Sequence, residues 1–291
     1  MALSRRTFTL LLATTPGIGG KSTTKVIARN ELLNRSPEQF LALAPEAMRE
    51  EYRLTEPAIA ALVADLPTRL RETQELERRL LELGVIWITA ADAHYPQLIE
   101  EMDPNPPEVL YLYGNNKLLD AKTFCVLSSR NAREADLDLI EQLTEQGVLS
   151  AEVLVTGHDR PEYQRSAVVP LRWGSPRILC LDRGFFEVLG PDLKREAFRT
   201  ARLWRYEFDA STDLVVSAFP PAASFKGINN QVRDRLVGCL SRRLDLVHVS
   251  PGGNMERIAK LAIRSGRAVR ISDRCLGYRQ YTALGAEVIS T

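Results

Sequence analysis

The chain has 291 residues, of which 45% are hydrophobic and 26% are charged, values typical of a globular protein with a buried core. The formal net charge is only +1, so a nucleic-acid-binding surface would have to come from a local cluster of basic side chains. The four cysteines lie far apart and the three histidines lack metal-ligand spacing, which argues against a zinc site. No apolar run approaches the ~18 residues of a membrane span. We therefore expect a cytoplasmic protein without a membrane segment.

The first part of the chain, residues 1–85, predicts a small helical domain. Ser36-Pro37-Glu38 is typical of a helix N-cap followed by a first turn. Over residues 66–83, leucines recur among arginines and glutamates as in an amphipathic helix, and Gly84 is a natural stop for it.

A glycine-rich turn interrupts the helical pattern at residues 15–23, which read Thr-Pro-Gly-Ile-Gly-Gly-Lys-Ser-Thr. A Walker A phosphate loop would need glycine at the position of Thr15, so we reject that interpretation. The better match is a helix-hairpin-helix turn of the Pro-Gly-Ile-Gly type. Its amides either hold a DNA phosphate or serve only to turn the chain, and both interpretations remain open.

From Val85 onward, short apolar runs alternate with helical patterns, as in a parallel sheet with crossover helices. The strands read as continuous apolar runs, which indicates a sheet covered on both faces. We expect an α/β fold, in which the helical domain is followed in the chain by an extended Rossmann-like parallel-sheet domain over residues 86–291. The expected strands are 124–127, 153–156, 177–181, 214–218, 244–249 and 267–271, and the expected helices are 134–146, 230–240 and 255–265.

Candidate anion-binding residues follow two of these strands. Arg130 stands at the carboxyl end of the strand 124–127, where open α/β folds bind ligands, and its guanidinium suits phosphate oxygens. The alternative is a surface salt bridge. Gly157 directly follows the strand 153–156, but His158-Asp159-Arg160-Pro161 come next, and a loop built from backbone amides does not keep its geometry without glycines.

A local basic cluster lies between Ser224 and Arg243, where five basic residues stand against Asp234 alone. Such a cluster supplies the salt-dependent part of DNA affinity, although a solvated helix face has the same composition. The basic residues are Lys226, Arg233, Arg235, Arg242 and Arg243.

A second glycine-rich turn, Pro251-Gly252-Gly253-Asn254, follows a strand and opens a helix. Amides at a helix N-terminus bind anions, with help from the helix dipole. Basic residues recur along the helix at three- and four-residue spacing and predict one basic stripe. They are Arg257, Lys260, Arg264 and Arg267.

Several of these segments resemble the DNA-processing protein A family (DprA, also called Smf). Residues 94–115 carry most of the family's Tyr-Pro-x-x-Leu and Asp-x-Pro-x-x-Leu-Tyr-x-x-Gly-Asn patterns, and residues 233–241 match its Arg-Asn-Arg-Ile-Ile-Ala-Gly-Leu-Ser segment. Ser128 replaces the glycine of the family's Val-Gly-Ser-Arg, and little beyond Gly157 survives of its glycine-rich loop. The resemblance extends over residues 8–272.

This resemblance implies a protein that binds single-stranded DNA, protects it and assists loading of the RecA recombinase in natural transformation and recombination. It also implies a homodimer, with no catalytic residue, metal or cofactor. The residues we expect at DNA or phosphate are Arg130, Gly157, Lys226, Arg233, Arg235, Gly252, Gly253, Asn254, Arg257 and Lys260.

Two other functions fit parts of the sequence. Pro251-Gly252-Gly253 also resembles the phosphate loop of nucleoside-monophosphate phosphoribohydrolases, which have a related Rossmann-type fold. A degenerate DprA paralogue that acts as a partner protein is the second alternative, because the loop after Gly157 has lost its glycines.

Overall fold

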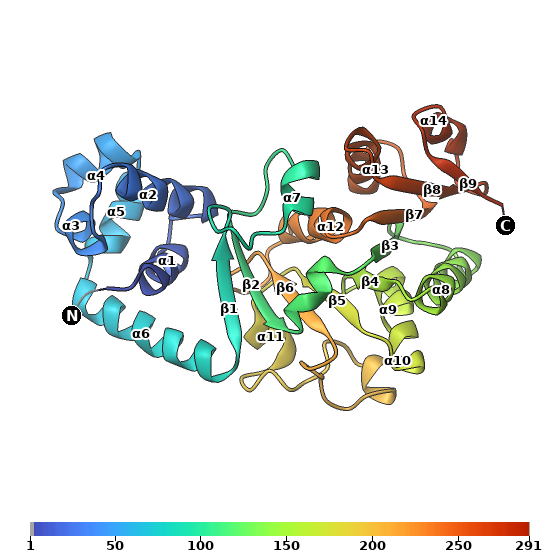
Figure 1. Ribbon diagram of the computed structural model, residues 1–291, viewed down its shortest axis with the longest axis horizontal. Helices are drawn as coiled ribbons and strands as arrows, with labels where there is room; N and C mark the ends of the chain where they lie inside the picture. The colour runs from blue at the N-terminus through green and yellow to red at the C-terminus, as the bar shows by residue number, and fades with distance from the viewer. Residues whose placement is uncertain (1–2, 291) are drawn as a thin grey trace. The chain divides into compact units, whose positions relative to one another are not determined.

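The computed structural model describes residues 3–290 and contains two compact units (Figure 1). The segment 1–85, for which the sequence predicts helices, falls in the first unit, together with a short strand and two further stretches of chain. The first unit comprises Met1–Tyr95 and Pro107–Tyr111, and the second comprises Pro96–Pro106 and Leu112–Thr291.

Helices make up most of the first unit. The predicted amphipathic helix is present, and it gives way to Gly84, whose φ of +75° suits glycine. In chain order the elements are α1 (Arg5–Thr14), α2 (Gly20–Leu32), α3 (Pro37–Leu41), α4 (Pro45–Tyr52), α5 (Glu56–Val63), α6 (Leu66–Glu82) and β1 (Val85–Thr89).

The helix starts and the core of this unit follow from local sequence. Ser36 and Gln39 form a reciprocal capping box at α3, which confirms the predicted cap. Phe40 then packs edge-on against Phe8 and Tyr52, with ring centroids 5.5 and 4.7 Å apart. These aromatic contacts bring α1, α3 and α4 together.

The segment predicted to be a helix-hairpin-helix turn joins α1 to α2. Gly17 has a φ of +83°, and a Cβ atom there would come within 3.2 Å of Ala58. Gly19 is the N-cap of α2 without any side-chain hydrogen bond. The packing against α5 explains the first glycine, so the turn has a structural role whether or not it also contacts DNA.

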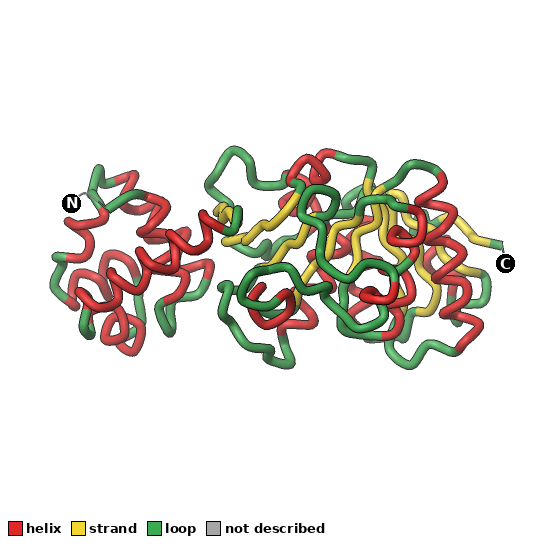
Figure 2. The backbone as a smooth tube through the Cα atoms, turned by 90° about the horizontal axis from the view of Figure 1, so that it is seen from below, coloured by secondary structure: helices red, strands yellow, loops and turns green. Residues whose placement is uncertain are grey.

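The second unit contains a parallel sheet with helices packed around it (Figure 2). Its strands lie in the order β6-β5-β4-β3-β7-β8-β9, and the last residues of β2, from Leu112 on, also belong to this unit. The bounds of the strands are β2 (Val109–Gly114), β3 (Thr123–Ser128), β4 (Val153–Thr156), β5 (Arg177–Leu181), β6 (Leu214–Ser217), β7 (Arg243–His248), β8 (Ala268–Ser272) and β9 (Glu287–Ile289). The helix α7 (Gln97–Met102) precedes β2. The remaining helices are η1 (Asn116–Asp120), α8 (Glu134–Leu149), α9 (Pro161–Ala167), α10 (Val169–Trp173), α11 (Phe185–Leu189), η2 (Ala201–Leu203), α12 (Asn229–Cys239), α13 (Asn254–Arg264) and α14 (Tyr278–Thr282).

The predicted α/β architecture and all six expected strands are confirmed. The three expected helices are present as α8, α12 and α13. Three strands of the described residues were not among those expected. They are β1 at the start of the alternating pattern, β2 after the prolines, and β9, which is only three residues long.

Candidate functional site

The neighbouring strands β3 and β7 mark the point where the sheet changes direction. The chain leaves β3 through α8 toward β4 on one side, and leaves β7 through α13 toward β8 on the other (Figure 1). Open α/β sheets bind ligands at such switch points, beyond the carboxyl ends of the strands. The two loops are tied together here, since the Ser129 amide donates to the His248 carbonyl over 2.7 Å and the Ser250 amide donates to Ser129 Oγ over 2.8 Å.

A pocket of about 370 Å³ opens at this switch point. Most of its lining residues have polar side chains, and three residues that the sequence predicted, Arg130, Gly253 and Asn254, are among them. The complete lining is Ser129, Arg130, Asn131, Arg160, Gly227, Asn230, Gln231, Asp234, Ser250, Gly253, Asn254 and Met255.

Arg130 is the exposed cation of this pocket. It directly follows Ser129, and the next residue, Asn131, has a φ of +63° that turns the chain sharply toward α8. Within residues 3–290, Arg130 forms no ion pair, so its guanidinium is available for an incoming anion. Ser128, which replaces the family's glycine, is buried, and its hydroxyl donates to the Ser129 carbonyl over 3.2 Å.

Asp234 is the acidic residue in the wall, and it joins three helices. Its carboxylate accepts hydrogen bonds from Tyr163 Oη over 2.7 Å and from Asn254 Nδ2 over 3.0 Å, and it pairs with Arg160 over 3.3 Å. The adjacent Arg233 contributes a further ion pair. Because Arg160 and Arg233 both pair with Asp234, the negative charge that this carboxylate brings to the wall is compensated.

Arg233 does not fill the role that we predicted for it. Its side chain is 0% exposed, with Nε 2.8 Å from Asp234 Oδ1 and an ion pair to Asp159. The guanidinium also lies over the Tyr163 ring, 4.6 Å from the centroid. All its donors are directed into the protein, so Arg233 supports the pocket wall and does not contact a phosphate in this conformation.

Gly157 likewise lies behind the pocket. A Cβ atom at this position would come within 2.8 Å of both Arg233 Nη1 and a Tyr163 ring carbon. The glycine therefore allows Arg233 to approach the backbone closely, and it does not present amides to the pocket. The next residue, His158, is buried 3.4 Å from Asp182, and burial lowers the pKa of this imidazole to about 4 against the opposing effect of Asp182.

Lys226 and Arg235 are placed differently from each other. Lys226 is exposed in the loop before α12, next to Gly227 of the pocket lining. Arg235 lies outside the pocket lining, where its Nε stands 3.1 Å from Asp103 Oδ2 beyond the end of α7. The predicted basic cluster is thus divided, and only Lys226 remains near the pocket with its charge unused within residues 3–290.

The glycine-rich turn before α13 is partly occupied by the protein's own carboxylate. The Gly252 amide donates to Glu256, which also pairs with Lys260 over 2.7 Å, and these two contacts lower the pKa of Glu256. Arg257 donates to the Gly252 carbonyl over 3.4 Å. Of the predicted stripe, Arg257 and Lys260 are therefore engaged near the turn and do not line the pocket. Gly253 remains at the pocket as the N-cap of α13, without a side-chain cap.

Sequence reasoning missed several pocket residues. Asn230 and Gln231 lie just before the family-like segment 233–241, and this proximity was the signal for them. Arg160 was passed over because the loop after Gly157 matched the family poorly. Its pairing with Asp234, 74 residues away, depends on the tertiary fold.

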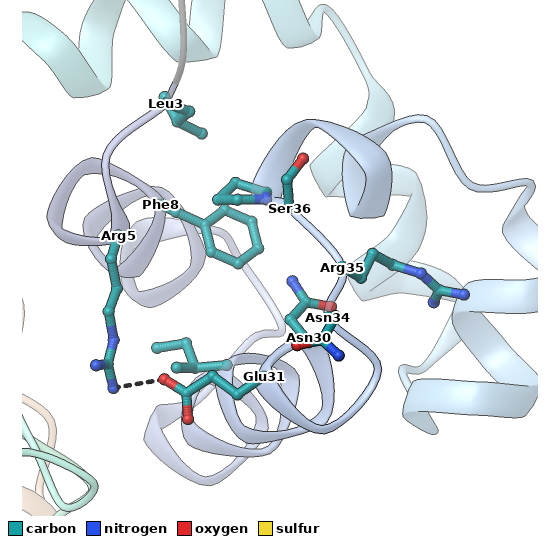
Figure 3. Close-up of a pocket in the computed structure, with 10 residues that line it drawn as sticks. Leu3, Arg5, Phe8, Asn30, Glu31, Asn34, Arg35 and Ser36 are labelled. Atoms are coloured by element: carbon teal, nitrogen blue, oxygen red, sulfur yellow. Dashed lines mark ion pairs between the residues drawn. The ribbon is translucent and has the colours of Figure 1, made fainter.

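A separate cavity of about 620 Å³ lies within the first unit (Figure 3). Arg5 and Glu31 form an ion pair there over 3.1 Å, and Phe8 and Ser36 are among the lining residues. None of the residues predicted to bind DNA lines this cavity.

Residues 3–290 contain neither a group of metal ligands nor a membrane-spanning helix. No group of three or more His, Cys, Asp and Glu side chains in residues 3–290 is arranged to hold a metal ion. None of the helices in that range is both long and apolar enough to cross a membrane.

The chain is similar to known proteins in part of its sequence and in its fold. Residues 86–160 match the family described as DNA recombination-mediator protein A. The fold is similar to DNA processing protein A from Streptococcus pneumoniae, at 17% identity and a TM-score of 0.70, covering 100% of this chain and 96% of that one. It is also similar to DNA processing protein A from Helicobacter pylori, whose structure concerns its single-stranded DNA binding mode, at 17% identity and a TM-score of 0.53, covering 70% of this chain and 91% of that one. No curated protein sequence matches the chain. The match over residues 86–160 and the shared fold confirm the predicted resemblance to the DNA-processing protein A family.

Proposed function

We propose that this protein binds single-stranded DNA in the pocket between the carboxyl ends of β3 and β7. The observation that carries the proposal is the exposed Arg130, which has no ion pair within residues 3–290 and shares the pocket with the uncapped N-terminus of α13 at Gly253. A guanidinium and helix amides together are the groups that bind a phosphate oxygen.

The other lining residues suit the rest of a nucleotide. Asn230, Gln231 and Asn254 supply side-chain amides, which both donate and accept hydrogen bonds to bases and sugars. Lys226 adds a cation beside the pocket at Gly227. The function thus needs neither Arg233 nor Arg235 as a direct contact, although the sequence predicted both.

The wider role follows from the family. We propose that the protein protects single-stranded DNA and assists loading of RecA in recombination or transformation, as a cytoplasmic homodimer and as a binding protein that catalyses no reaction. The similar Helicobacter pylori protein, whose single-stranded DNA binding mode is known, supports the first part of this role.

The nucleotide-hydrolase alternative has less support. Hydrolysis would need a free carboxylate at the pocket, but Asp234 is held by Arg160, Arg233, Tyr163 and Asn254. Glu256 is bound to the Gly252 amide and to Lys260. The degenerate-paralogue alternative predicts no DNA binding at all, and one titration separates it from our proposal.

The test is fluorescence anisotropy of labelled poly-thymidine, with salt varied and duplex DNA as competitor. Arg130→Ala should weaken binding, whereas Arg71→Ala, which removes an exposed arginine of α6, is the control of equal charge and should have little effect. Absence of binding at low salt would contradict the proposal. The nucleoside-monophosphate alternative would then be tested by binding and hydrolysis assays.

A further inference from the structure

A group of large apolar side chains is exposed far from the pocket. Leu203, Trp204 and Tyr206 are 82%, 52% and 81% exposed, and they follow one another between η2 and β6. Scattered apolar residues at a surface are ordinary, but three within four positions form a patch of the kind that marks an interaction site.

The patch and the pocket lie at opposite ends of the strands of the sheet. Its segment leads into Asp213 and the first residue of β6, and the neighbouring Trp173 ends α10 just before β5 begins. It therefore lies at the amino ends of the strands, whereas Arg130 lies at a carboxyl end. A ligand in the pocket does not reach this patch unless it extends across the sheet.

The side chains point outward because the backbone between them is anchored inward. Arg205 pairs over 2.8 Å with the buried Glu196, and it also pairs with the buried Asp213. Ala201 is buried on one side of the segment, and Phe208, on the other side, packs against Tyr113 with ring centroids 5.6 Å apart. The exposure of Leu203, Trp204 and Tyr206 is thus fixed by the fold and is not that of a loosely attached loop.

Trp204 is braced from one side. The Arg172 guanidinium lies over its ring, 5.1 Å from the centroid, and is itself paired with Glu141. With one face covered and half of the side chain still exposed, the ring has surface left on which a planar group can stack.

Two exposed arginines precede the patch in the sequence, and the exposed Glu207 follows it. Arg199 and Arg202 are exposed, and neither forms an ion pair within the described part of the chain. They lie one helical turn apart, because the Arg202 amide donates to the Arg199 carbonyl. No acidic residue lies between Arg199 and Tyr206 in the sequence.

We infer that this surface, defined by Arg199, Arg202, Leu203, Trp204 and Tyr206, is a second contact region for single-stranded DNA. Exposed aromatic rings beside unpaired arginines are the elements that bind single strands, through base stacking and phosphate contacts. Bases stack on Trp204 and Tyr206, while Arg199 and Arg202 neutralise the flanking phosphates. The inference rests on the proposed function, since the strand held in the pocket is the one that continues to this surface.

The test uses Trp204 as its own reporter. The sequence holds two other tryptophans, Trp87 and Trp173, which the Trp87→Phe/Trp173→Phe variant removes. Addition of poly-thymidine of about 30 nucleotides, longer than typical single-strand sites of about 4–16 nucleotides, should quench the remaining emission, and salt should reverse the quenching. An oligonucleotide of about 6 nucleotides should bind the pocket with little quenching.

The matching affinity measurement uses Trp204→Ala/Tyr206→Ala, which should bind the long oligonucleotide about tenfold more weakly and the short one unchanged. Arg199→Ala/Arg202→Ala should reduce both quenching and affinity. Arg49→Ala/Arg71→Ala removes two exposed arginines of the first unit and serves as the control of equal charge.

The outcomes separate this inference from the proposed function. Anisotropy that reports binding of the long oligonucleotide while Trp204 emission stays unchanged would overturn the second contact region and leave the pocket proposal intact. The surface would then be one for a protein partner. A loss of affinity no greater than in the arginine control would overturn it as well. Absence of any binding in the anisotropy titration would instead refute the pocket and the second region together.

Discussion

Arg233 and Asp234, neighbours on α12, form a buried ion pair with Nε 2.8 Å from Oδ1, and this pair separates the pocket from the protein interior. Asp234 reaches the pocket wall, whereas Arg233 points to Asp159 and the Tyr163 ring behind it. Arginine and aspartate thus act as one unit, in which the arginine balances the charge that the carboxylate brings to the wall.

Replacement of Arg233 by alanine should therefore reduce stability more than it reduces DNA contact. Removal of one partner of a buried pair leaves the other charge uncompensated, at about 3–5 kcal/mol. We expect urea denaturation of Arg233→Ala to show a loss of this order. Arg235→Ala should cost less, because the Arg235 side chain is one-third exposed, although its partner Asp103 is buried. A stable Arg233→Ala protein that fails to bind DNA would return Arg233 to the role that the sequence suggested.

Gly157→Ala should be destabilising for a steric reason. The new Cβ atom would stand 2.8 Å from Arg233 Nη1 and from a Tyr163 ring carbon, and overpacking of this kind costs about 1–3 kcal/mol. Gly227→Ala is the matched control, because nothing lies within 4 Å of a Cβ atom at that position. Equal midpoints for the two variants in thermal denaturation would show that the buried arginine can move aside.

Arg130→Ala should change the salt dependence of DNA binding and leave stability unaltered. Loss of one phosphate contact should reduce the slope of log affinity against log salt by about 0.7 for a single strand. Because Arg130 is exposed and unpaired within residues 3–290, its removal should alter the free energy of unfolding by no more than about 0.5 kcal/mol. Arg130→Lys keeps the charge but loses the planar guanidinium that can bind two phosphate oxygens at once. This variant should retain most of the salt dependence and bind DNA with lower affinity. An unchanged slope in the alanine variant would mean that DNA does not meet Arg130.

Stability should fall in mild acid because of His158. Burial holds the pKa of its imidazole at about 4, below the value of 6.5 for an exposed histidine, so the unfolded chain takes up a proton that the folded protein does not. The contribution of His158 to stability is full above pH 6.5 and is lost as the pH falls toward 4, by up to about 1.4 kcal/mol per pH unit. The groups around it are Asp182, Asp159, Arg183 and Arg233.

Urea denaturation between pH 4 and 7 would measure this effect. His158→Gln should flatten the pH dependence, whereas His94→Gln, which replaces an exposed histidine, should keep it. The same slope in the wild type and in His158→Gln would assign the acid sensitivity to other groups, among them the carboxylates of Asp159 and Asp136, whose pKa values are lowered in the fold.

Features that depend on neighbours in the chain could be predicted from the amino-acid sequence. Capping residues such as Ser36, the leucine spacing of α6 and the apolar runs of the central strands all specify local structure within a few residues. The place of Arg130 was predictable for the same reason, since it follows a recognisable strand and the carboxyl ends of parallel strands share one edge.

Which arginines are left without an ion pair depends on the tertiary structure. Arg130 and Arg233 both occupy family-like positions, but Asp159, 74 residues before Arg233, directs the second one inward. The buried cluster of Arg177, Glu196 and Asp213 joins residues up to 36 positions apart and also left no local pattern. The amino-acid sequence does not distinguish a charged side chain that is hydrated from one that is paired with a distant carboxylate. Only the packing of distant segments supplies that carboxylate, because a buried charge is tolerated solely where the fold provides its partner.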